Sequence, residues 1–272
     1  MIHIDHLKKS YASFTLDCSL DIPKGIITGI IGMNGAGKST LFKSILDINP
    51  IDKGNIQIPD KQDIGVVLSE TGFSEFFTVS DIISILKCTY KRFDEDLFHS
   101  YCQRFDIPLD KKTRTFSTGM KAKLNIIIAL THHAKLLILD EPTAGLDVLT
   151  RDEILDILRD YMEQEDCTIL ISSHISSDLE SLCDDLYVID HGQIIMHEEM
   201  DTLLSQYGVL KVSKEDYDNL DKDYLLEVMK EPFGYSCLTN VRQFYSENYP
   251  TIVIEQNHID TMIPILLKGE RL

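Results

Sequence analysis

Eight consecutive residues near the start of the chain, from Gly32 to Ser39, have the types and spacing that bind phosphate. They read G-x-x-x-x-G-K-S, with glycine at positions 32, 35 and 37. Glycine lets the backbone turn tightly, and the N–H groups of such a loop converge on an anion. In this pattern Lys38 reaches the β- and γ-phosphates of a nucleotide, and the hydroxyl of Ser39 binds Mg²⁺. The segment therefore predicts a loop that holds a nucleoside triphosphate.

The residues on either side of the loop have the pattern that this motif requires. Residues 25–31 are a short apolar run rich in β-branched side chains, which is typical of a buried parallel strand. Residues 40–46 can form a helix. The positive end of its dipole would stabilise an anion by roughly 0.3–2 kcal/mol. Strand, glycine loop and helix in this order favour a phosphate-binding loop over a chance Gly-rich turn.

Two acidic residues follow a second apolar run. Residues 136–139 are Leu-Leu-Ile-Leu, and Asp140, Glu141 and Pro142 come directly after them. Ligands of open α/β sheets bind at the carboxyl ends of the strands. We expect Asp140 to hold Mg²⁺ through water and Glu141 to polarise the attacking water. Alone the tripeptide could be a surface turn, but beside the glycine loop it predicts the second half of a hydrolytic site.

The chain at this point resembles a known family, the ATP-binding subunits of ABC transporters, over about residues 1–200. Further matching segments occur in the family's order. Tyr11 matches an aromatic residue that stacks on adenine, and residues 64–70 lie where the family has a Gln-bearing loop. Residues 116–120 match the family signature, residues 144–147 match the loop after the catalytic glutamate, and residues 172–174 end in the switch histidine.

The sequence departs from the family pattern at two places. The signature, usually L-S-G-G-Q, here reads F-S-T-G-M, so Ser117 and Gly119 match. These two supply a hydroxyl and a backbone N–H at a helix start, which are the groups that bind phosphate. The Gln-bearing loop has Ser69 followed by Glu70. Either side chain could bind the metal or its water, and the residues leave this choice open.

The resemblance implies a role for each matching residue. Glu141 would be the general base and His174 would contact the γ-phosphate, so these two are the expected catalytic residues. The residues expected to contact ATP are Tyr11, Asn34, Gly35, Gly37, Lys38, Ser39, Thr40, Ser117, Gly119 and Asp147. The residues expected to hold Mg²⁺ are Ser39, Asp140 and Ser69.

The resemblance also implies partners. Two chains would pair head to tail, so that each signature closes on the ATP of the other chain. A homodimer is chemically sufficient because one chain carries all the catalytic residues. The two ATPase subunits would drive a separate membrane permease. By analogy with the family, a solitary ATPase with a short appendage favours export. The chain would then be cytoplasmic, at the inner face of the membrane. Residues 73–77, rich in Phe, would meet the permease or pack within the helical lobe.

Composition limits the remaining classes. The net charge is −18, which argues against nucleic-acid binding and against direct adhesion to an anionic bilayer. The chain contains no run of about 18 apolar residues, so no membrane span is predicted. Its first residues lack a signal-peptide pattern. The six cysteines are scattered without a C-x-x-C pair, so they are expected to be reduced thiols rather than a zinc site.

Strand-like and helix-like segments alternate along the chain. Short strands are expected within 1–30 and 54–68, then helices from a cap at Ser80 to residue 90, over 94–105 and over 119–132. Strands at 136–139, 168–172 and 186–189 alternate with helices near 149–162 and 176–183, and residues 191–192 turn back into 193–196. This order predicts an α/β fold with a parallel sheet and helices on both faces. We expect a nucleotide-binding domain over 1–200, with an inserted helical subdomain at about 72–133 that bears the signature.

Residues 201–272 carry no recognisable motif. They retain enough aromatic and aliphatic residues to pack, so we expect a small α/β appendage rather than a disordered tail.

Competing functions are disfavoured: a chromosome-structure ATPase would carry a long coiled coil, and a tandem translation-associated ATPase would carry two copies. A phosphate-loop kinase would lack the signature and switch motifs. The remaining alternative is a regulatory or non-transport subunit with little hydrolysis of its own, which Glu141 argues against.

Overall fold

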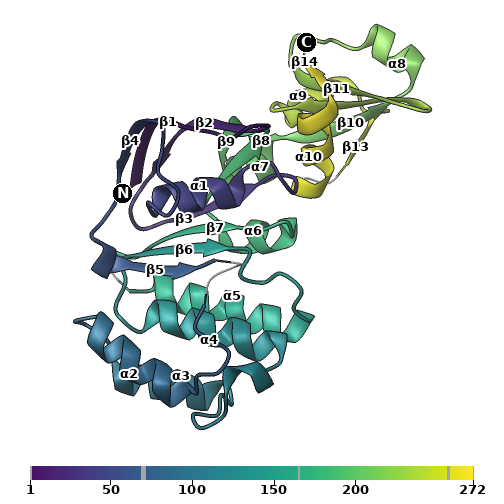
Figure 1. Ribbon diagram of the computed structural model, residues 1–272. Coiled ribbons are helices and arrows are strands. Elements are labelled where there is room, and N and C mark those ends of the chain that lie inside the picture. The colour runs from purple at the N-terminus through teal and green to yellow at the C-terminus, as the bar shows by residue number, and fades with distance from the viewer. Residues whose placement is uncertain (1, 69–71, 165, 256–257, 272) are drawn as a thin grey trace.

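The computed structural model describes residues 2–68, 72–164, 166–255 and 258–271. Its centre is a six-stranded sheet in the order β5-β6-β7-β3-β8-β9 (Figure 1). The strands are β3 (Ile27–Ile31), β5 (Ile64–Val67), β6 (Leu136–Asp140), β7 (Thr168–Ser172), β8 (Asp185–Asp190) and β9 (Gln193–Glu199). Neighbours from β5 to β8 run parallel, and β9 returns antiparallel to β8 through the turn at residues 191–192. The predicted parallel sheet is confirmed.

The central strands are buried on both faces, so successive side chains enter two different cores. Leu136 and Ile138 of β6 lie in one core, and Leu137 and Leu139 lie in the other. This is why these strands read as continuous apolar runs in the sequence. The first core is closed by helix α1 (Lys38–Ile45) and by a separate three-stranded antiparallel sheet.

That antiparallel sheet has the order β2-β1-β4. Its strands are β1 (Ile2–Ser10), β2 (Thr15–Ile22) and β4 (Lys53–Gln57). Short strands were predicted in this part of the chain, but not as a sheet separate from the parallel one. The signal was present, because β2 buries every second residue, and such alternation is typical of a strand with one face in solvent.

Helices cover the opposite face of the parallel sheet, and a helical lobe follows below them (Figure 1). The helices are α2 (Val79–Thr89), α3 (Glu95–Arg104), α4 (Thr118–Leu130), α5 (Val148–Met162) and α6 (Ser176–Leu182), with 3-10 turns η1 (Lys61–Asp63) and η2 (Thr113–Thr115). The predicted cap of α2 was wrong by two residues. Thr78, not Ser80, caps this helix, because its hydroxyl accepts the Asp81 N–H while the Asp81 carboxylate accepts the Thr78 N–H.

The last part of the chain forms a third sheet, all antiparallel, in the order β13-β10-β12-β11-β14. Its elements are α7 (Met200–Gln206), β10 (Gly208–Val212), α8 (Lys214–Asn219), β11 (Leu225–Glu231), β12 (Gly234–Thr239), α9 (Arg242–Asn248), β13 (Val253–Glu255), α10 (Ile259–Lys268) and β14 (Glu270–Arg271). The sheet has a small apolar core of its own. Helix α10 buries Ile259, Met262 and Ile265 in the core that holds Leu137 and Leu139, which we call the main core. The predicted α/β appendage is therefore docked on the body of the protein.

Two further sequence predictions can be compared with the structure. All six cysteines are free thiols, and Cys88 is the exposed one. Among the described residues, no helix is both long and apolar enough to cross a membrane.

Candidate functional site

The predicted phosphate loop and the predicted acidic strand end meet in one hollow of about 420 Å³. The hollow lies at the carboxyl edge of the parallel sheet, where β3, β6 and β7 end. Its lining residues are Phe14, Asn34, Gly35, Gly37, Lys38, Ser39, Thr40, Glu141, Ala144 and His174. The structure thus brings together eight of the residues that the sequence analysis singled out.

Glycine is needed at two positions of the loop for different structural reasons. Gly37 is the N-cap of α1 with a φ of 118°, a backbone conformation that L side chains rarely adopt. Gly32 is needed for space instead: a Cβ there would lie 2.2 Å from the carbonyl oxygen of Ile189 at the end of β8. Gly32 therefore fixes the loop against the sheet, whereas we expected it to shape the turn.

Lys38 lies at the floor of the hollow and is 6 % exposed. Its Nζ donates to the carbonyl oxygen of Gly32 at 2.7 Å and lies 3.6 Å from Oε1 of Glu141. The single cation of the loop thus faces the carboxylate that follows β6. A buried ammonium held at this place is a strong electrostatic partner for phosphate oxygens.

Glu141 has an unusual backbone conformation, with a φ of 53°. This left-handed region costs a non-glycine residue about 1–2 kcal/mol. Ser172 at the end of the neighbouring strand β7 holds it there, because the Glu141 N–H donates to both the carbonyl oxygen of Ser172 at 3.2 Å and its Oγ at 3.1 Å. Strain of this kind gathers at sites where the direction of a side chain matters.

His174 holds the side chain of Glu141. The His174 backbone N–H donates to Oε2 of Glu141 at 3.1 Å, and Nδ1 of the same residue lies 2.5 Å from that oxygen. The His174 side chain itself is 51 % exposed and lines the hollow, so its other ring nitrogen can meet a ligand there. The two expected catalytic residues are therefore in direct contact.

Asp140 is almost completely buried, at 1 % exposure. Its Oδ1 accepts from the Ser172 hydroxyl at 2.7 Å, while Oδ2 has no hydrogen-bond partner in the described structure. A buried carboxylate oxygen without a donor is costly unless a cation or water meets it. Hard oxygen donors of this kind are what Mg²⁺ prefers, so Asp140 together with the hydroxyl of Ser39 fits that ion.

Two residues of the site were missed by the sequence analysis. Ser172 joins Asp140 and Glu141, as described above, and it was predicted only as part of the segment that leads to His174. Phe14 lines the hollow and lies against the loop, since a Cβ on Gly37 would come within 2.9 Å of its ring. The expected adenine-stacking residue, Tyr11, lies beside it with ring centroids 6.3 Å apart. Stacking of adenine on Tyr11 stays a prediction.

The signature residues Ser117 and Gly119 are not among the described residues that line the hollow. Ser117 is the N-cap of α4 and accepts the Met120 N–H at 3.2 Å. Gly119 packs closely on α5, because a Cβ there would be 3.1 Å from Cγ2 of Thr150. Asp147 caps α5 by accepting the N–H of Thr150 at 3.1 Å and its hydroxyl at 2.8 Å, and these hydrogen bonds lower the pKa of Asp147.

The predicted Mg²⁺ contact of Ser69, and its alternative Glu70, lie outside the described residues. Their roles stay predictions.

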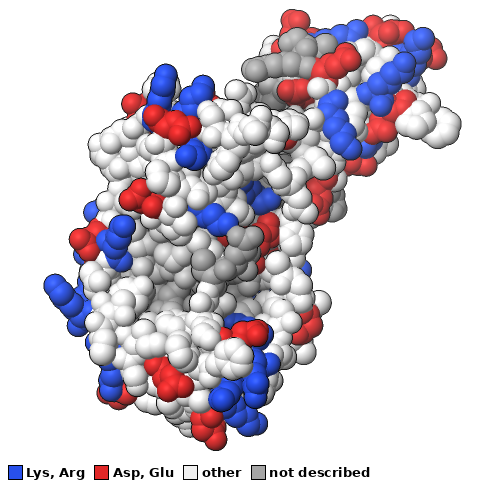
Figure 2. Space-filling view, viewed as in Figure 1, with Lys and Arg blue, Asp and Glu red and all other residues white. Residues whose placement is uncertain are grey.

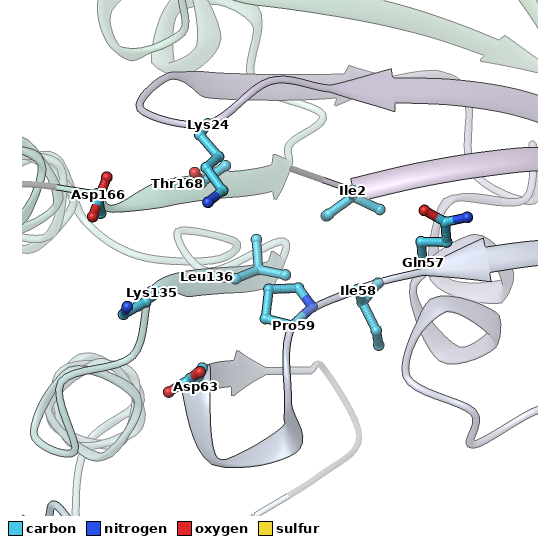
Figure 3. A pocket seen from close by; sticks show the side chains of 10 residues that line it. All are labelled: Ile2, Lys24, Gln57, Ile58, Pro59, Asp63, Lys135, Leu136, Asp166 and Thr168. Carbon is cyan, nitrogen blue, oxygen red and sulfur yellow. The ribbon is translucent and has the colours of Figure 1, made fainter.

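A second hollow, of about 350 Å³, opens at the opposite edge of the parallel sheet (Figure 3). Lys24, Asp63, Lys135 and Asp166 line it, and each precedes a parallel strand. Both lysines and Asp166 are exposed, and the charges are mixed. This hollow is therefore unlike the convergent set of groups around Lys38.

A parallel sheet, a phosphate loop after β3 and a buried aspartate followed by a glutamate after β6 define a phosphate-loop nucleoside triphosphatase of the α/β class. Comparison with known proteins identifies the family. A family model described as "ABC transporter" matches residues 16–144. A shorter model for an AAA domain, described as a putative AbiEii toxin of a type IV toxin–antitoxin system, matches residues 112–177.

Two curated relatives agree with this family, and a solved structure agrees with the fold. The chain is 31 % identical to the ABC transporter ATP-binding protein YtrB of Bacillus subtilis over 213 residues, which are 75 % of this chain and 73 % of YtrB. It is 35 % identical to the lantibiotic transport ATP-binding protein SrtF of Streptococcus pyogenes over 212 residues, which are 74 % of this chain and 92 % of SrtF. The dimeric ATP-binding cassette MJ0796 bound to ADP and Pi superposes with a TM-score of 0.65 at 19 % identity, covering 74 % and 99 % of the two chains. The chain belongs to the ATP-binding subunits of ABC transporters and is an ATP hydrolase.

Proposed function

We propose that two copies of this chain pair head to tail around two molecules of Mg-ATP and drive export through a separate permease. The observation that carries this proposal is the separation of two phosphate-binding ends within one chain. Lys38 and Ser39 line the hollow, whereas Ser117 at the start of α4 is not among the described residues that line it. A second copy would supply the missing serine and helix end to the γ-phosphate.

Exposed apolar side chains support the pairing. Val148 and Leu149, directly after Asp147, are 68 % and 77 % exposed, and Met33 of the phosphate loop is 56 % exposed. Apolar side chains exposed close to a binding site favour burial against a partner. Asp147 and its neighbours would then lie in the interface between the two copies.

The chain's own residues account for the chemistry of hydrolysis. Glu141 would accept a proton as the oxygen of water bonds to the γ-phosphorus, and the bond from that phosphorus to the bridging oxygen would break to give ADP and phosphate. His174 keeps the carboxylate of Glu141 in place, and Lys38 would neutralise charge on the leaving side. Asp140 and Ser39 would hold Mg²⁺, which when bound neutralises the β- and γ-phosphates and orients them.

Export and permease docking rest on separate observations. SrtF is named for lantibiotic transport, which supports export for this chain. Phe76 and Phe77, before α2, are 67 % and 37 % exposed, while Phe73 packs on the main core. We propose that the two exposed rings face the permease, and that this contact holds the chain at the cytoplasmic side of the membrane. On the face in Figure 2, Lys and Arg lie among Asp and Glu, which supports the expectation that nucleic acid is not a partner.

The test is the Glu141→Gln variant, which keeps the shape of the side chain but cannot accept the proton. With Mg-ATP it should elute from size exclusion at twice the monomer mass, because bound ATP stays uncleaved between two copies. The matched control adds Lys38→Ala, which should remain monomeric since it cannot hold the phosphates. A monomeric Glu141→Gln variant at saturating ATP would contradict the paired site, and a wild-type chain without ATPase activity would favour a regulatory subunit.

A further inference from the structure

Helix α6 begins two residues after His174 and lacks a local cap. Its N-cap residue is Ile175, and no side-chain hydrogen bond closes its first turn. A helix of seven residues has little stability on its own. Its position, and with it the direction of the preceding His174, must therefore be fixed by contacts from other elements.

One set of contacts links α6 to the loop that follows β6 and carries Glu141. Asp178 of α6 is completely buried and pairs with Arg151 of α5. Its Oδ2 also accepts the hydroxyl of Thr143 at 2.7 Å, and Thr143 lies two residues after Glu141. A buried carboxylate held from two sides therefore links α6 to the loop that carries Glu141.

A second set of contacts comes from the appendage, about 80 residues further along the chain. The hydroxyl of Ser176, the first residue of α6, donates to Oδ1 of Asp260 in the first turn of α10. In return Oε1 of Glu180 accepts the N–H of Ile259, the first residue of α10, at 2.6 Å, and His258 Nδ1 lies 3.1 Å from Oε2 of Glu180. Each helix thus receives a carboxylate from the other at its N-terminus, where the helix dipole favours negative charge.

The apolar side chains beneath these hydrogen bonds make the contact rigid. Ile259 and Met262 of α10 are 1 % and 2 % exposed, and Leu179 of α6 is 0 % exposed, all within the main core. The carboxylate exchange therefore lies over a packed interface. It is not a loose surface ion pair, whose contribution would be small.

We propose that the appendage sets the turnover of the ATPase site, and that Asp260 is a positioning residue that acts through Ser176 on α6 and His174. This inference rests on the proposed function, since it assigns a regulator to the same hydrolytic site. Anything that lifts α10 from α6 would loosen His174 and slow hydrolysis. ATP binding itself should be retained, because the phosphate loop leads into α1 and not into α6.

The test measures steady-state ATP hydrolysis by the full chain with Asp260→Ala, Ser176→Ala and both together. Loss of one hydrogen bond should lower kcat by about 3- to 10-fold while KM for ATP changes by less than about twofold. The double variant should lose no more than the stronger single variant, because both remove the same contact. Hydrogen exchange of residues 173–182 should speed up in each variant, which reports on the geometry without relying on turnover.

The matched control is Asp218→Ala, which removes one exposed carboxylate from α8 of the same appendage. It should leave kcat and the exchange of residues 173–182 unchanged. An unchanged kcat in Asp260→Ala, additive losses in the double variant, or equal losses in the Asp218→Ala control would overturn the proposal. A wild-type chain that does not hydrolyse ATP would instead refute the proposed function, so the two failures are distinguishable.

Discussion

Replacing Ser172 by Ala should damage the site more than its single hydroxyl suggests. Ser172 is completely buried, and its hydroxyl donates to Oδ1 of Asp140 at 2.7 Å. Without it, a carboxylate that is 1 % exposed would have neither oxygen hydrogen-bonded. A hydrogen bond to a charged group is worth about 1.5–3 kcal/mol. The free energy of unfolding should therefore fall by about that amount, and the melting temperature by about 3–10 °C.

The same variant should also slow hydrolysis. The Ser172 Oγ accepts the N–H of Glu141 at 3.1 Å, and it helps to hold the left-handed backbone of that residue. If poorer positioning of Glu141 raises the activation free energy by about 1.4 kcal/mol, kcat falls tenfold. We also expect a higher Mg²⁺ concentration for half-maximal rate, because Asp140 would no longer be oriented.

Two assays measure these effects. The chain has no tryptophan, so urea unfolding should be followed by circular dichroism, and phosphate release should be followed over a Mg²⁺ series. The control is Ser44→Ala, which makes the same chemical change at a buried hydroxyl that has no hydrogen-bond partner in the described structure. If Ser172→Ala unfolds at the same urea concentration as this control and retains full kcat, the assigned role of Ser172 is refuted.

Two more predictions follow from the site and the core. Lys38→Ala should abolish nucleotide binding, because no other lysine or arginine is among the described residues that line the hollow; equilibrium dialysis with labelled ATP measures this, and wild-type affinity would contradict it. His132, which is stacked on Tyr90 and bonded to the carbonyl oxygen of Ile64, has its pKa lowered by burial. Since the unfolded chain binds this proton more readily, stability should fall as pH drops below about 6.5, and His132→Asn should flatten that slope in urea titrations at pH 5–7.

The parts of the site that local sequence encodes were predictable. The loop from Gly32 to Ser39 needs a strand before it and a helix after it, and both are set by adjacent residues. The strand before Asp140 is apolar because it is buried on both faces, so its carboxyl end could be located. The cap of α2 was predicted at Ser80, although Thr78 and Asp81 have the residue types and the spacing of a capping box.

Contacts between distant residues were not predictable from one sequence. Ser172 meets Asp140 through the pairing of two neighbouring strands, and a serine at the end of a strand has no periodicity that marks it. The left-handed backbone of Glu141 depends on that partner, so its own residue type gives no signal. Phe14 reaches the loop because β1 and β2 form a separate sheet, whereas Tyr11 was favoured by order in the chain alone.

The burial of α10 in the main core has a consequence for how the protein unfolds. Ile259, Met262 and Ile265 share one apolar cluster with the strands and helices of the nucleotide-binding body, so the end of the chain supplies part of that cluster. Separate unfolding of the appendage would leave this shared surface in water, at a cost of about 25 cal/mol for each Å² exposed. The appendage and the six-stranded sheet are thus thermodynamically linked, and we expect them to denature as one cooperative unit.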